Sequence, residues 1–166
     1  ALATNSSNSS SIRVYLGNGD GSFQQSGKFA DGLAPLTLIK KDLNDDKRDD
    51  LIAASGLGDN LYMFYSNGDG TFQNGVPFSA GGGPISLVAD QFDDDGRMDV
   101  AVANSRSHNF SLVARQPDGR FKFPTRDYLT TAAPLSITSG DYDGNGTADI
   151  AVAITDLNIV EIYLRK

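Results

Sequence analysis

One acidic pattern occurs three times in this chain at a nearly constant step. The copies are DLNDDKRDDLIAA (residues 42–54), QFDDDGRMDVAVA (91–103) and DYDGNGTADIAVA (141–153). Their closing aspartates are Asp50, Asp99 and Asp149, which are 49 and 50 residues apart. A fixed internal period has to be explained by the fold, because repeat architectures build one structural unit per period.

Two further features keep the same step. The prolines that open the preceding apolar segments are Pro35, Pro84 and Pro134. The aspartates of the turns GNGDGSF, SNGDGTF and RQPDGRF are Asp20, Asp69 and Asp118, each 49 residues from the next. Independent features with one period indicate that the whole chain is an array of repeats.

Each unit reads as four short strands. In the unit that contains the second acidic pattern, apolar and β-branched segments cover residues 84–92, 100–103, 110–115 and 121–128. The Asp-Gly turn at Asp118 is a strong hairpin signal, because glycine accepts the left-handed backbone that such turns need. No segment has helical periodicity. Four strands in about 50 residues predict an all-β chain built from the four-stranded antiparallel blades of a β-propeller.

The third acidic loop carries oxygen-bearing side chains at alternate positions, followed by a glycine that permits a sharp turn. Its candidate metal ligands are Asp141, Asp143, Asn145, the carbonyl group of Thr147, and Asp149. Calcium takes six to eight oxygen ligands in flexible geometry, which this pattern can supply. The loop differs from an EF-hand because it runs into a strand rather than a helix. One copy alone could be an ordinary acidic turn, since Asp, Asn and Gly dominate turns.

The other two loops depart from this pattern at single positions. Their candidate ligands are Asp42, Asn44, Asp46, the Arg48 carbonyl group and Asp50, and then Gln91, Asp93, Asp95, the Arg97 carbonyl group and Asp99. Lys47 stands where a glycine is expected, which costs roughly 1 kcal/mol if the backbone there is left-handed. Gln91 replaces an aspartate by a neutral amide. We therefore expect the third loop to bind a cation at least as tightly as the second.

The acidic loop followed by a short strand, together with an N-G-D-G-[ST]-F hairpin downstream, resembles the FG-GAP/VCBS repeat family of integrin α-chain-type β-propellers. The resemblance covers essentially the whole chain. It implies calcium in the hairpin between the first and second strands of each blade, hence up to three ions here. It also implies an extracellular module for adhesion or binding more often than an enzyme.

The repeat predicts one partial propeller domain with units at about residues 1–30, 31–79, 80–129 and 130–166. The first unit holds strands two to four of a blade, and the last holds strands one to three. Closed propellers have four to eight blades, whereas this chain has about 3.4 units. Either the chain is part of a longer propeller, which is the preferred interpretation, or copies associate to complete a ring.

Composition constrains partners and location. The formal net charge of −7 argues against nucleic acid as a partner. No apolar run is long enough to insert into a membrane. We expect an extracellular, secreted or cell-surface protein whose targeting signals lie elsewhere, with a protein or glycan as ligand. Asn5 and Asn8 begin formal glycosylation sequons.

Two classes of function compete. The first is a calcium-stabilised binding module, and the second is a carbohydrate-active hydrolase or lyase on a propeller. Catalytic residues usually break a repeat, whereas the clustered carboxylates here obey it, and His108 is isolated in a turn. We therefore expect no enzymatic activity. The aligned Phe23, Phe72 and Phe121 are expected to pack between blades rather than to stack on a ligand.

Overall fold

A computed structural model describes residues 2–4, 10–122 and 126–166, and the sequons at Asn5 and Asn8 lie outside these residues. The first sheet consists of β1 (Leu2–Thr4), β2 (Ser11–Gly17) and β3 (Phe23–Phe29). The second consists of β4 (Pro35–Lys41), β5 (Asp50–Ser55), β6 (Asn60–Phe64) and β7 (Val76–Ser79). The third consists of β8 (Pro84–Asp90), β9 (Asp99–Asn104), β10 (Asn109–Val113) and β11 (Arg126–Leu129). The fourth consists of β12 (Ser136–Gly140), β13 (Asp149–Ile154) and β14 (Ile159–Tyr163).

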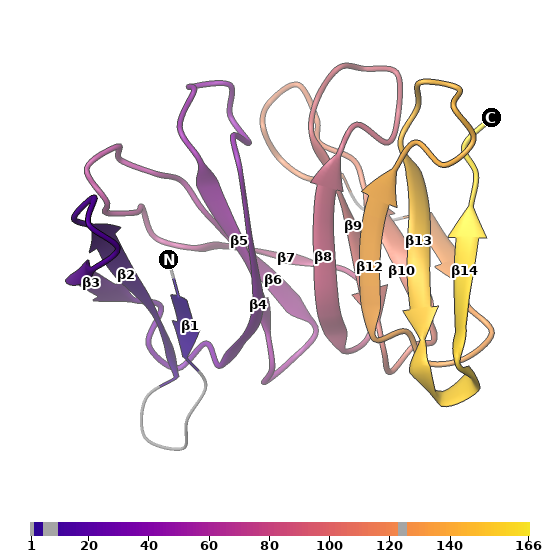
Figure 1. The fold of residues 1–166 in the computed structure, drawn as a ribbon, viewed down its shortest axis with the longest axis horizontal. Coiled ribbons are helices and arrows are strands. Elements are labelled where there is room, and N and C mark those ends of the chain that lie inside the picture. The colour runs from indigo at the N-terminus through magenta and orange to yellow at the C-terminus, as the bar shows by residue number, and fades with distance from the viewer. Residues whose placement is uncertain (1, 5–9, 123–125) are drawn as a thin grey trace.

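Strands pair antiparallel with their neighbours in sequence, so each sheet is a meander. Each predicted repeat unit contains one of these sheets. The first strands β4, β8 and β12 lie next to one another, and the sheets stand side by side as propeller blades do (Figure 1). The all-β expectation of four-stranded antiparallel blades is confirmed. A 3₁₀ turn, Thr155–Leu157, is the one helical segment among the described residues.

One strand was predicted wrongly. The fourth strand of the third sheet was expected over residues 121–128, but β11 begins at Arg126. Phe121 instead forms an isolated bridge with Arg115. The aromatic ring of Phe121 is buried in the core between the sheets, so its apolar character reflects packing of the turn rather than a place in the strand.

The core lies between successive sheets, so the inner sheets bury both faces. In β9, Val100 and Val102 pack in a cluster with residues of the second sheet, whereas Ala101 and Ala103 pack with residues of the fourth. Successive strand residues point to opposite faces. A strand buried on both sides therefore reads as an unbroken apolar run rather than an alternating one, as in DVAVAN.

Aromatic rings join neighbouring sheets. Phe72 stacks on Phe29 of the first sheet with centroids 5.1 Å apart, and Phe121 stacks on Phe78 of the second at 4.6 Å. The expected packing between blades is confirmed for these two phenylalanines. Phe23, which occupies the same position in the first unit, is 70% exposed.

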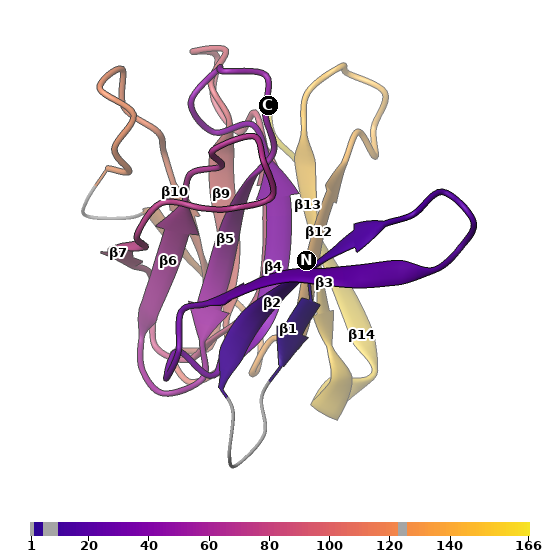
Figure 2. The same ribbon diagram turned by 90° about the vertical axis from the view of Figure 1, so that its left-hand side faces the viewer.

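The acidic loops connect the first and second strands of the second, third and fourth sheets, where the resemblance placed them. They gather along one edge of the molecule, at the top of Figure 1. The first sheet is turned relative to the other three (Figure 2). Within the described residues, no helix has the length and apolar character to cross a membrane.

The packing between the third and fourth sheets predicts a large cost for Phe110→Ala. Phe110 is 1% exposed and contacts the rings of Tyr128 and Tyr163. Its truncation should lower the free energy of unfolding by about 3–5 kcal/mol, since the cavity is walled by sheets that cannot collapse. Urea denaturation measures this value. Leu57→Ala, at a 75% exposed position, should change it by no more than about 0.5 kcal/mol, and equal costs would contradict the packing described.

Candidate metal centre

The closing aspartate of each acidic loop is buried and accepts two backbone hydrogen bonds. One carboxylate oxygen accepts the N–H of the second loop residue, and the other accepts the N–H of a residue just after the third strand of the sheet. The donors are Leu43 and Ser66 for Asp50, Phe92 and Arg115 for Asp99, and Tyr142 and Arg165 for Asp149, at 2.8 to 3.3 Å. The closing aspartate thus links the acidic loop to the segment that follows the third strand of the same sheet.

Burial has an electrostatic cost at two of these aspartates. Loss of solvent raises the pKa of Asp99 to about 6, although the hydrogen bond from the Arg115 backbone N–H acts in the opposite direction. Burial also raises the pKa of Asp50. The neighbouring loop carboxylates add to both shifts, because like charges disfavour ionisation. A cation near these groups would relieve this cost.

The third loop brings three carboxylates together. Oxygens of Asp141, Asp143 and Asp149 all lie within 4.8 Å of one another, which occurs for no other trio of acidic, His or Cys side chains in the described part of the chain. Asp141 and Asp143 are exposed, whereas Asp149 is buried. The loop backbone curls around Asp141, whose oxygens accept the N–H groups of Gly144 at 2.7 Å and Gly146 at 2.9 Å.

The remaining candidate ligands of this loop lie beside the trio. The amide oxygen of Asn145 accepts both the N–H and the hydroxyl group of Thr147, at 2.8 and 2.5 Å. The amide nitrogen of Asn145 donates to Asp143 at 3.2 Å and to the Arg165 carbonyl oxygen at 2.9 Å. Three carboxylates, an amide oxygen and a backbone carbonyl group are the oxygen donors that a calcium ion requires.

In the first and second loops, an arginine of the same loop binds one of the candidate carboxylates. Arg48 forms an ion pair with Asp46 at 2.9 Å, and Arg97 pairs with Asp95. The hydrogen bond from Arg48 lowers the pKa of Asp46. The sequence predicts only a carbonyl ligand from each of these arginines, whereas their guanidinium groups supply a positive charge inside the loop. Thr147 occupies the corresponding position in the third loop.

A second arginine reaches each of these two loops from the following sheet. Arg115 lies 3.2 Å from Asp45 of the first loop, and Arg165 pairs with Asp94 of the second. The third loop has Gly144 at this position. From the sequence, Asp94 is expected to compensate for the neutral Gln91 as a ligand, whereas it pairs with an arginine here; the roles of Asp45, Arg115 and Arg165 are not predicted, although Asp45 and Asp94 are one period apart, as are Arg115 and Arg165. Charged residues that recur with the repeat were the available signal.

The three loops have the same left-handed backbone at one position but different residues there. Lys47 has φ of 66° at the position where Gly96 and Gly146 have 77° and 82°. The predicted left-handed conformation of Lys47 is therefore present. It orients the Lys47 N–H toward Asp42, which accepts it at 2.8 Å, so the first loop keeps the shape of the third despite the larger residue.

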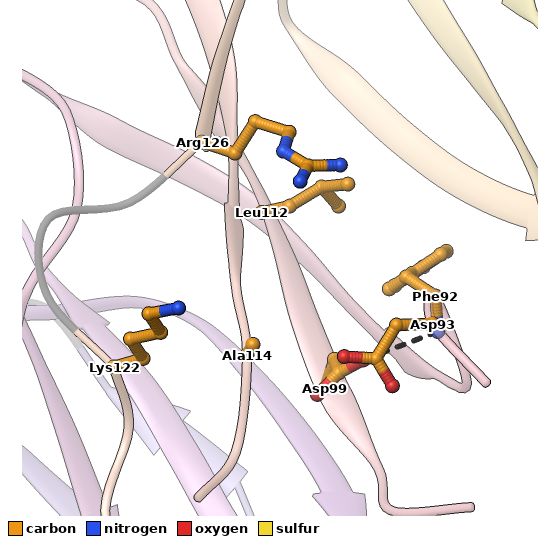
Figure 3. Close-up of a pocket in the computed structure, with 7 residues that line it drawn as sticks. All are labelled: Phe92, Asp93, Asp99, Leu112, Ala114, Lys122 and Arg126. Carbon is orange, nitrogen blue, oxygen red and sulfur yellow. Dashed lines mark hydrogen bonds between the residues drawn. The ribbon is translucent and has the colours of Figure 1, made fainter. Parts of the chain in front are cut away.

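A cavity of about 450 Å³ lies beside the second loop. Phe92, Asp93 and Asp99 line one side, and Lys122 and Arg126 approach from the other, across Leu112 and Ala114 (Figure 3). Ala114 follows the third strand at the position where the second sheet has Tyr65, which packs against the core between sheets. The smaller side chain leaves this space open.

The repeated loops and sheets match a known family. The profile of the FG-GAP-like repeat matches residues 42–102 and 91–152, which together make up more than half of the chain. The chain belongs to the FG-GAP-like repeat family. The matched segments begin at the first acidic loop and end in the strand after the third, so the FG-GAP assignment rests on the elements described above. No curated protein matches this FG-GAP chain.

The solved structures similar to this FG-GAP chain include BBS1N, determined in complex with ARL6DN and soaked with lead. The similarity has a TM-score of 0.54 at 10% sequence identity and covers 98% of the present chain. The chain spans 57% of that relative. At this identity the match establishes the β-propeller fold alone.

The double hydrogen bond of the closing aspartate predicts a cost that does not depend on metal. Asp149→Ala leaves the partly buried N–H groups of Tyr142 and Arg165 without an acceptor, at about 1–3 kcal/mol in total. Denaturant unfolding in the presence of a chelator should show this loss. Asp118→Ala, which removes an exposed turn acceptor for Arg120, should cost less. If Asp149→Ala leaves the free energy of unfolding unchanged in the presence of a chelator, the two hydrogen bonds of Asp149 do not stabilise the sheet.

The left-handed backbone at Lys47 predicts that Lys47→Gly stabilises this FG-GAP protein. Relief of about 1–2 kcal/mol of backbone strain exceeds the entropic cost of glycine, about 0.5–1 kcal/mol. Thermal unfolding should show a higher midpoint for this variant. Lys41→Gly, in β4 where φ is not positive, should lower the midpoint. A drop for both variants would contradict the argument.

Proposed function

We propose that this FG-GAP propeller is an extracellular calcium-binding module that recognises a protein or a glycan. The observation that carries the proposal is the convergence of Asp141, Asp143 and Asp149. Calcium is held first in the third loop and stabilises the blade there. The first and second loops are weaker sites, up to a total of three ions.

The proposed order of calcium affinity among the three loops follows from their charge. Each of the first two loops receives two guanidinium groups on its carboxylates, which repel an incoming cation and occupy its ligands. Within the described residues, no lysine or arginine side chain pairs with the trio of the third loop. Calcium is favoured over magnesium because it tolerates irregular geometry and a higher coordination number.

The bound ion would act on the fold through this chain's own ligands. Asp149 accepts the N–H of Arg165, two residues after β14, and Asn145 donates hydrogen bonds both to Asp143 and to the Arg165 carbonyl oxygen. An ion held by both aspartates stabilises the native state only, in proportion to ln(1 + [L]/Kd). Exposed loops of this kind suit the millimolar calcium outside cells, where weak sites are occupied.

Ligand recognition is assigned to surfaces that vary between the repeats. The cavity next to Asp93 differs from the other repeats, because Ala114 is the smallest residue at a position that the other units fill with Leu16, Tyr65 and Leu164, and it presents both Lys122 and Arg126. Its mixed charges and apolar wall suit the hydroxyl groups and ring faces of a sugar as well as a peptide. BBS1N was determined in complex with ARL6DN, so a propeller of this fold can carry a protein-binding surface. A glycan array distinguishes the two ligand classes.

Binding rather than catalysis is proposed because the clustered carboxylates have structural partners. The closing aspartates accept two backbone N–H groups each, and Asp46 and Asp95 pair with arginines. His108 is exposed in the turn between β9 and β10, where its carbonyl oxygen accepts the N–H of Thr130. These residues hold the repeat together, and a non-catalytic role accounts for all of them.

Calcium titration by isothermal calorimetry, paired with thermal unfolding, tests the proposal. The wild-type protein should bind calcium and unfold at a higher temperature in its presence, with a smaller effect from magnesium. Asp143→Asn removes one charge from the trio but keeps an oxygen acceptor, and should weaken the tightest site at least about tenfold, or 1.4 kcal/mol.

Asp93→Asn is the matched control, because Asp93 occupies the same loop position in the second repeat. It should leave the tightest site unchanged. No heat of binding and no thermal shift in the wild-type protein would overturn the calcium proposal. An equal loss of calcium affinity at the tightest site in both variants would contradict the assignment of that site to the third loop.

A further inference from the structure

The fifth and seventh residues of the acidic loop change together between the repeats. An aspartate and an arginine stand there in the first two loops, and an amide and a hydroxyl side chain in the third. The residues are Asp46 and Arg48, Asp95 and Arg97, and Asn145 and Thr147. Within the described residues, three carboxylates converge only in the third loop, where both positions are uncharged. The arginine is thus present in the loops whose carboxylates do not converge.

In the first loop, Arg48 binds the carboxylate group of the fifth loop residue. Its Nη2 atom lies 2.9 Å from Oδ2 of Asp46, and its Nε–H donates to the same oxygen at 3.1 Å. The backbone N–H of Arg48 donates to Oδ1 of Asp46 at 2.9 Å. Both oxygens of a candidate calcium ligand are therefore bound by a single residue of the same loop.

The guanidinium group of Arg48 is also held by the turn after the third strand of its sheet. Its Nη1 atom donates to the carbonyl oxygen of Asn67 at 3.0 Å. The side chain packs closely on the next residue, because a Cβ atom added at Gly68 would come within 2.9 Å of Cδ of Arg48. The position of the charge is thus fixed from two sides, although the side chain is 47% exposed.

The charge of Arg48 acts on every carboxylate that the sequence assigns to metal in the first loop. The hydrogen bond with Asp46, together with the charges of Asp46, Asp50 and Asp42, raises the pKa of Arg48. A calcium ion in this loop would need the same three carboxylates, because it binds through oxygen ligands. Arg48 therefore supplies from within the protein the positive charge that an ion would bring.

The third loop keeps the same connection without an arginine. The N–H and hydroxyl group of Thr147 donate to the amide oxygen of Asn145 at 2.8 and 2.5 Å. The amide nitrogen of Asn145 donates to the carbonyl oxygen of Arg165, after the third strand, at 2.9 Å. This bond replaces the one from Arg48 to Asn67. An arginine at the seventh position is therefore not needed to shape the loop.

We propose that Arg48 is the resident cation of the first loop and that the seventh residue sets the calcium affinity of each loop. Arginine neutralises the carboxylates internally and keeps the affinity low, whereas threonine leaves them to the metal. This inference rests on the calcium sites proposed above. Arg97 has the same role in the second loop, where it pairs with Asp95 and its Nε–H donates to the Arg115 carbonyl oxygen at 3.0 Å.

Calcium titration of Arg48→Thr by isothermal calorimetry tests the proposal. The titration is made in the Asp143→Asn background, so that the weakened third loop does not mask the first. The other candidate ligands remain, so calcium affinity of the first loop should rise at least about tenfold, or 1.4 kcal/mol. The thermal midpoint should also rise with calcium by more than in Asp143→Asn alone. Arg48→Gln, which keeps a donor for the Asn67 carbonyl oxygen, should give the same gain.

Arg106→Thr is the matched control, because it removes the same charge at the opposite end of β9 from the acidic loop. Arg106 pairs with Asp59, and neither residue belongs to a loop. This variant should leave calcium affinity unchanged. An equal gain in Arg106→Thr and Arg48→Thr would overturn the role of Arg48, since the gain would then reflect net charge alone.

The same titrations separate this inference from the proposed function. If the wild-type protein binds calcium and neither Arg48 variant raises the affinity of the first loop, the role of Arg48 is wrong and the third-loop site stands. If the wild-type protein binds no calcium but Arg48→Thr does, the third-loop site is wrong and the role of Arg48 stands. If no variant binds calcium, both are overturned.

Discussion

The hydrogen bonds of a buried aspartate hold together one end of each repeated sheet. Asp50, Asp99 and Asp149 each accept one N–H from the loop before their own strand and one from the chain after the third strand. Burial makes the negative charge costly, as the raised pKa of Asp99 shows. The sheet therefore depends on a charge that its surroundings have to balance, and the three repeats balance it differently.

Two solutions to this electrostatic problem appear in one chain. In the first two repeats, guanidinium groups from the same loop and from the next sheet reach the loop carboxylates, so charge balance also links neighbouring sheets. In the third repeat, the loop has Gly144 and Thr147 where the others have Asp45 and Arg48, and the carboxylates instead converge on one another. A repeat can thus lose its arginine partners and keep the backbone of its loop. The calcium ion proposed for the third loop would supply the positive charge that the arginines supply in the other two.

The repeat period was enough to predict the fold. The details of the acidic loops could not be predicted in this way, because they depend on residues from neighbouring sheets. Spacing and composition predicted four strands per unit, the acidic loops between first and second strands, and the left-handed Lys47. They failed at Phe121, because an apolar side chain in a turn and one in a strand look alike in sequence. They also missed the reach of Arg115 to Asp45, since that contact joins residues 70 positions apart. Local patterns determine a repeat well, but contacts between repeats depend on how the sheets are stacked.

The stacking of the sheets also determines which apolar positions are buried and which are exposed. Each inner sheet is buried on both faces, so its sequence encodes an apolar surface for the sheet before it and another for the sheet after it. The terminal sheets keep the same encoded positions, because Val160 and Phe23 occupy the sites of Leu61 and Phe121. The burial of an apolar position in this repeat therefore depends on the sheet packed against it, and not on its own strand alone. This is why equivalent residues of different sheets can differ between core and surface.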